Sequence, residues 1–183
     1  MNWVKNQEMM KNRLNETIFK NDPLHFNEDQ YSTDDCFNSG CIVELKNREK
    51  YTAQAFNGSF IEKIKYDPLI KKAKDQNKIP YYIVRFIGDV WFSWNLEEIN
   101  KKRELKWRTM SLPKTSKFYR NDDVDKLVAD LYLDEASPLD LTIRGMNEES
   151  LQKSFKNSNL QYAQWTEWSF LNWYNKMEKH YEH

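Results

Sequence analysis

The chain has 183 residues, of which 39% are hydrophobic and 15% aromatic, and its 28 basic side chains balance its 28 acidic ones. This length suits one domain with a small appendage, and only four Gly and five Pro argue against a disordered chain or a turn-rich β-sandwich. No apolar stretch is long enough for a membrane helix, the N-terminus lacks a signal-peptide core, and two Cys do not make a disulfide framework. We therefore expect a cytoplasmic protein with no membrane partner.

The neutral total hides an uneven distribution of charge along the chain. Residues 41–120 contain 18 Lys and Arg but only nine Asp and Glu, so the remainder carries the compensating acids, most densely over residues 122–149. A basic segment favours contact with a polyanion such as nucleic acid. Ordinary solvated surface charge explains the same pattern equally well.

The N-terminal half of the chain predicts a helix, a strand hairpin and a second helix. Apolar residues recur at helical spacing near the N-terminus, and an alternating segment precedes a turn and a second strand. Ser59 and Glu62 have the spacing of a capping box at the start of the second helix. The predicted elements are a helix over residues 2–20, strands over 31–37 and 41–48, and a helix over 58–77.

The C-terminal half predicts a second hairpin followed mainly by helix. Strands are expected over residues 79–87 and 90–96, then a basic, poorly periodic segment over 97–121, a short helix over 122–133 and a helical tail from about residue 147. This order is typical of an α/β fold with a mixed central sheet flanked by helices. We expect the α/β core to occupy residues 1–121 and a helical C-terminal extension, residues 122–183, to pack on it.

The tripeptide Glu44-Leu45-Lys46 is the main candidate for chemistry. Side chains alternate along a strand, so Glu44 and Lys46 should share one face while Leu45 turns into the core. Acidic oxygens can hold a divalent cation, and a neighbouring lysine can act on a phosphate or an attacking water. The chain also contains Glu104-Leu105-Lys106, which has no preceding apolar strand, so the tripeptide gains its meaning from context.

Either of two upstream acids could share the site with Glu44. A two-residue turn at Asn38-Ser39 would place Asp35 on the face of Glu44, whereas a three-residue loop that includes Gly40 would place Asp34 there. The sequence leaves these registers open.

Taken together, the order of elements and the motif over residues 2–96 resemble the PD-(D/E)xK nuclease superfamily, whose core is called restriction-endonuclease-like. No Pro precedes the candidate Asp, which departs from the named pattern. The segments that look like small phage-type members are Asp35-Cys36-Phe37, Val43-Glu44-Leu45-Lys46-Asn47-Arg48, Tyr51, Glu62-Lys63-Ile64-Lys65 and Leu112-Pro113-Lys114-Thr115.

This resemblance implies roles for individual residues. It favours Asp35 over Asp34, and it implies that Asp35, Glu44 and the carbonyl of Leu45 bind Mg²⁺, with Mn²⁺ as a substitute. Lys46 would orient or deprotonate the attacking water or stabilise charge on the phosphate. The remaining implied roles are backbone phosphate contacts by Arg48, Lys65 and Lys114.

We therefore expect a Mg²⁺-dependent DNA endonuclease of phage or mobile-element type, acting in the host cytoplasm if phage-encoded. A homodimer would suit cleavage of both strands. The alternative is a nuclease-fold module without catalysis that binds DNA or a protein partner.

Overall fold

The computed structural model describes residues 3–26, 36–48, 51–113, 123–139 and 141. Over these residues, no helix has the length and apolar character needed to cross a membrane. The helical tail expected from residue 147 lies outside the described residues, so the division into residues 1–121 and 122–183 stays a prediction.

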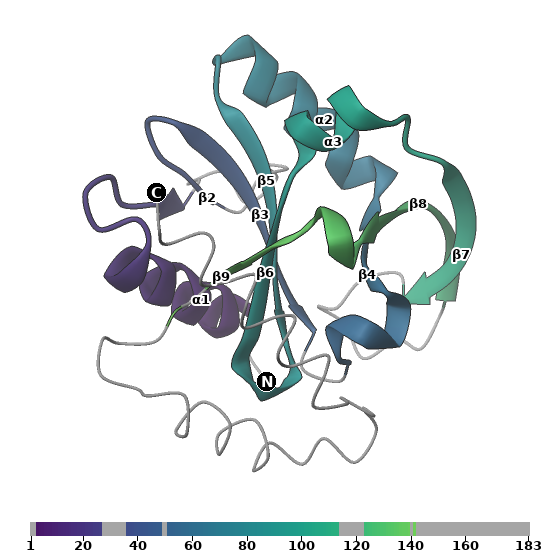
Figure 1. Cartoon of the computed structure of the whole chain (residues 1–183), viewed down its shortest axis with the longest axis horizontal. Coiled ribbons are helices and arrows are strands. Elements are labelled where there is room, and N and C mark those ends of the chain that lie inside the picture. Colours follow the sequence, from purple (N-terminus) through teal and green to yellow (C-terminus); the bar gives the residue numbers. More distant parts are fainter. Residues whose placement is uncertain (1–2, 27–35, 49–50, 114–122, 140, 142–183) are drawn as a thin grey trace.

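A mixed sheet of six strands forms the centre of the fold (Figure 1), in the order β1-β2-β3-β5-β6-β9. Strands β3 and β5 run parallel, and the other neighbours in this sheet pair antiparallel. The predicted α/β class with a mixed sheet is therefore confirmed. The strands are β1 His25–Phe26, β2 Cys36–Phe37, β3 Cys41–Arg48, β5 Ile79–Phe86, β6 Val90–Asn95 and β9 Ser137–Leu139.

One face of this sheet is covered by α1 (Trp3–Thr17), the purple helix of Figure 1. Met10 and Leu14, four residues apart on that helix, are completely buried against Val43 and Leu45 of β3. The i, i+4 spacing places both side chains on one helix face, which explains why this amphipathic segment forms a helix.

The opposite face carries α2 (Lys63–Asp75), α3 (Leu96–Lys102) and a second, antiparallel sheet in the order β4-β8-β7. These strands are β4 Gly58–Glu62, β8 Asp123–Tyr132 and β7 Trp107–Pro113. Hydrogen bonds join the two sheets. The indole N–H of Trp94 donates to the carbonyl of Tyr132 at 2.8 Å, the Tyr82 hydroxyl donates to the carbonyl of Phe60 at 3.0 Å, and Arg48 of β3 also donates to β4. The second sheet is thereby held against the first.

The helix predicted over residues 58–77 is wrong at its beginning. Residues 58–62 form β4, and α2 begins only at Lys63. Ser59 is therefore no helix cap: its hydroxyl accepts a hydrogen bond from Arg48 at 3.1 Å. Pairing of β4 with β8 outweighs the local capping-box spacing, since it satisfies the backbone of a segment that is mostly buried.

The expectations for residues 97–133 also need correction. The segment predicted as a short helix is β8, and the segment predicted as irregular contains α3 and β7. Strand β8 buries Ala129 and Leu131 on one face and Val128 on the other, between two partner strands. These pairings join segments that are distant in the sequence, and the local pattern of β8 does not predict them.

The β2–β3 hairpin follows neither register considered from the sequence. Cys36 pairs with Val43 and Phe37 with Ile42, so the turn residues are Ser39 and Gly40. The two cysteines therefore do not face each other. Both are buried free thiols, and burial raises the pKa of Cys41 to about 11.

Gly58 should be intolerant of a side chain because it has φ of +131°, and an added Cβ would lie 2.0 Å from the carbonyl oxygen of Leu131. We expect Gly58→Ala to lower the free energy of unfolding by about 3 kcal/mol or more. An added Cβ at Gly40 meets nothing within 4 Å, so Gly40→Ala should change it by less than about 0.5 kcal/mol. Urea titration of both variants tests this, and equal losses would contradict the described β4–β8 pairing.

Candidate active site

Strand β3 sends alternate side chains into two different environments. Val43 and Leu45 enter the core beneath α1, whereas Ile42 belongs to the core on the side of α2. Glu44 and Lys46 follow Ile42 on that second face, so the predicted orientation of the tripeptide is confirmed. Glu44 is only 4% exposed, an unusual position for a carboxylate, which is expensive to bury without compensating interactions.

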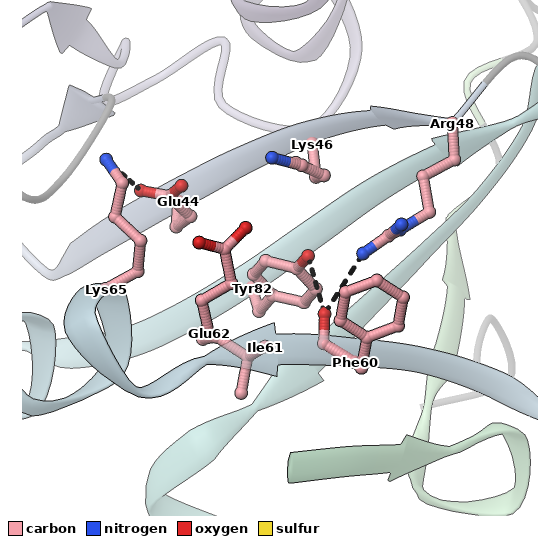
Figure 2. Close-up of a pocket in the computed structure, with 8 residues that line it drawn as sticks. All are labelled: Glu44, Lys46, Arg48, Phe60, Ile61, Glu62, Lys65 and Tyr82. Atoms are coloured by element: carbon pink, nitrogen blue, oxygen red, sulfur yellow. Dashed lines mark hydrogen bonds and ion pairs between the residues drawn. The ribbon is translucent and has the colours of Figure 1, made fainter. Parts of the chain in front are cut away.

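A small pocket open to solvent lies between β3, β4 and the first turn of α2, with an empty volume of about 280 Å³ that includes open solvent. Figure 2 shows the carboxylates of Glu44 and Glu62 and the ammonium of Lys46 directed toward this space. The lining residues are Glu44, Lys46, Arg48, Phe60, Ile61, Glu62, Lys65 and Tyr82.

Both pocket carboxylates have lysine partners. The ammonium of Lys65, on α2, lies 3.8 Å from Oε2 of Glu44. Lys126, on β8, forms a closer ion pair of 3.0 Å with Oε2 of Glu62. With Lys46 and Arg48 added, the cations around the pocket outnumber the two carboxylates. The pocket therefore combines acidic oxygens with an excess of positive charge, which suits an anionic substrate.

Arg48 lines the pocket but is engaged within the protein. Its guanidinium donates to the Ser59 hydroxyl at 3.1 Å and to the Phe60 carbonyl at 3.2 Å, and it lies 4.0 Å from the centre of the Phe60 ring. These contacts attach β3 to β4. The predicted phosphate contact by Arg48 remains a prediction, and any such contact would use a side chain already fixed by the fold.

The second copy of the tripeptide has a different environment. Leu105 is buried, but Glu104 and Lys106 are both exposed and do not line the pocket. Identical residues thus occupy a plain surface at one position and a pocket at the other.

Some of the predicted site residues are not described. Asp34, Asp35 and Lys114 lie outside the described residues. Within the part of the chain that the structure describes, no group of three or more Asp, Glu, His or Cys side chains could hold a metal ion. Glu44 and Glu62 offer hard oxygen donors in one pocket, and Mg²⁺ prefers donors of this type. Two carboxylates are too few for such a group, so a further acid is needed to complete a Mg²⁺ site.

Glu62 is not among the metal ligands expected from the sequence, because its spacing from Ser59 fits a helix cap equally well. In the structure it is the last residue of β4, precedes α2 without any capping hydrogen bond, and lines the pocket opposite Glu44. The short run Phe60-Ile61 before it, of types common in strands, is the signal that could have found it.

No known family model matches this chain, and no curated protein or solved structure shows significant similarity to it. The geometry of the pocket therefore carries the functional argument.

Arg48 and Lys46 should differ in how much each contributes to the free energy of unfolding. We expect Arg48→Met to lower the free energy of unfolding by about 1–2 kcal/mol, since it removes two hydrogen bonds and the packing of the guanidinium on the ring. Lys46→Met should change it by less than about 0.5 kcal/mol, because Lys46 is half-exposed. Thermal or urea unfolding measures both, and a larger loss at Lys46 would refute this division.

Proposed function

We propose that this protein is a Mg²⁺-dependent DNA endonuclease with a restriction-endonuclease-like core, acting on phosphodiester bonds in the pocket of Glu44 and Lys46. The observation that carries the proposal is the nearly buried Glu44, which shares a pocket with Lys46 and a second carboxylate, Glu62. A structural role alone gives little reason to place two acids and four cations around one pocket.

Asp35 is proposed to complete the ligand set. It directly precedes Cys36, which pairs with Val43, the neighbour of Glu44 in the chain. Asp35, Glu44 and the carbonyl of Leu45 would hold Mg²⁺, with Mn²⁺ as a substitute, and Glu62 supplies a further oxygen donor. When bound, the metal would polarise the scissile phosphate and lower the pKa of an attacking water.

The other pocket residues act on the substrate through charge and position. Lys46 orients the water or stabilises the charge that develops on the phosphate oxygens. Lys65 is paired with Glu44 and can also attract the substrate backbone, because its side chain is 40% exposed. Lys126 holds Glu62 in the pocket until a metal or substrate competes for it.

One observation favours the alternative of a non-catalytic nuclease-fold module. Glu44 and Glu62 both have lysine partners, an arrangement that balances their charge without a metal. Such a pocket could bind a DNA phosphate or an acidic protein partner without cleaving anything.

Cleavage of plasmid, nicked and branched DNA in the presence of Mg²⁺ tests the proposal. We expect Glu44→Gln, Lys46→Met and Asp35→Asn each to reduce the cleavage rate on the order of 100-fold or more, because each removes a group of the reaction centre. Chelation with EDTA should abolish cleavage, and Mn²⁺ should restore it.

The second tripeptide supplies the matched control. Glu104→Gln and Lys106→Met make the same chemical changes on an exposed segment and should leave the rate within about twofold, since neither side chain reaches the pocket. If Glu44→Gln cleaves as fast as wild type, the site assignment is wrong. Binding of DNA without cleavage under any metal would favour the non-catalytic module.

A further inference from the structure

We infer that the side of α2 facing the β2–β3 hairpin is a binding track for the phosphate backbone of DNA, formed by Lys65, Lys72 and Lys78 and running outward from the pocket. This inference rests on the proposed function in its choice of DNA as the partner. It adds the path that the substrate strand takes beside the reaction centre.

The lysines of the track lie along one surface. Lys65 and Lys72 are seven residues apart on α2, which is two helical turns, so their side chains leave the same face of the helix. Lys78 follows the helix before β5 begins. All three side chains are at least partly exposed.

A single aromatic ring fixes the outer end of the track. The ammonium of Lys78 lies 4.9 Å from the centre of the Phe37 ring, and that of Lys72 lies 6.0 Å from the same centre. Two positive charges are thus gathered beside one ring on β2. A phosphate lying beside this ring would be within reach of both ammonium groups.

The track is continuous with the pocket. Phe37 pairs with Ile42, which shares its face of β3 with Glu44. At the inner end, Lys65 lines the pocket beside Glu44. A strand whose phosphate lies in the pocket would therefore pass over Lys65 and on toward Phe37.

The spacing of the lysines agrees with that of nucleic acid. Seven residues of helix span about 10.5 Å, and one DNA strand carries a phosphate about every 3.4 Å along a duplex axis. Lys65 and Lys72 would therefore contact phosphates about three nucleotides apart. Because lysine contacts to phosphate carry no sequence information, this binding should be independent of sequence.

The same helix contains lysines that do not belong to the track. Lys71, which is 81% exposed, pairs with Asp75 at 3.4 Å, and Lys63 pairs with Asp67 at 3.0 Å. Lys74 is also exposed. The carboxylates of α2 thus lie with lysines outside the track, and these residues provide a control of equal charge.

The experiment compares two double variants for binding to a fluorescent 20-base-pair duplex in EDTA, where cleavage does not occur. We expect Lys72→Gln/Lys78→Gln to weaken binding on the order of tenfold and to lower the slope of log affinity against log salt by up to about two, since each phosphate that a lysine neutralises adds about 0.9 to that slope. Lys71→Gln/Lys74→Gln should change both values little. Lys72→Arg/Lys78→Arg keeps the charge and should keep the affinity, which separates loss of charge from loss of folding.

The track would be overturned if both double Gln variants weakened duplex binding equally, or if neither weakened it. Failure of the wild type to bind the duplex would also overturn it. Since binding is measured without metal, the outcome is distinct from that of the cleavage assay. Failure of cleavage with a selective loss at Lys72 and Lys78 would reject the nuclease and retain the track. If the wild type cleaves DNA but Lys72→Gln/Lys78→Gln shows no selective loss of binding, the nuclease is retained and the track is rejected.

Discussion

The carbonyl oxygen of Phe60 is the point on which the arrangement of the pocket depends. It accepts one hydrogen bond from Tyr82 of β5 and another from Arg48 of β3, while the Phe60 ring lies against the same guanidinium. The second sheet is thereby fixed to the central one at β4 (Figure 2). Glu62 follows two residues later on that strand, and Lys65 lies in the first turn of α2. Their position opposite Glu44 is therefore a consequence of how β4 docks.

Burial and charge act against each other in this pocket. Removing the carboxylate of Glu44 from water is unfavourable, and a cation at 3.8 Å offsets only part of that cost. Proteins keep such groups where chemistry needs them or where a network compensates them fully. Lys126 plays the same compensating part for Glu62 from a different strand. Lys65 belongs to α2 and Lys126 to β8, so each carboxylate is paired with a lysine from outside its own strand.

Local patterns predict β3, β5 and β6 of the central sheet well, but they predict neither its edge strands β1 and β9 nor the second sheet. The apolar run Cys41-Ile42-Val43 that opens β3 and the hairpin of β5 and β6 have the composition of strands, and only a short turn separates β5 from β6. Strand β8, in contrast, is rich in acids and gains its place by pairing with β4 and β7. Since the local pattern of β4 predicts the start of a helix, Glu62 is left out of the expected ligands, whereas the strand pattern of β3 correctly places Glu44 and Lys46 on one face. The turn at Ser39-Gly40 is missed because moving a two-residue turn by one position along the chain shifts the register by two residues, which leaves the faces of both strands unchanged.

The repeated tripeptide shows which part of the sequence specifies the site. Leu45 and Leu105 are both buried, so the same alternation operates at both positions. The difference arises from what the neighbouring residues face. At the first copy, β4 and α2 close over the strand and bring Glu62 and Lys65 to it, whereas the second copy lies between α3 and β7 with its charged residues in water. Whether a Glu-Leu-Lys tripeptide lies in a pocket therefore depends on strand pairing between distant parts of the chain. Here that pairing is β4 with β8.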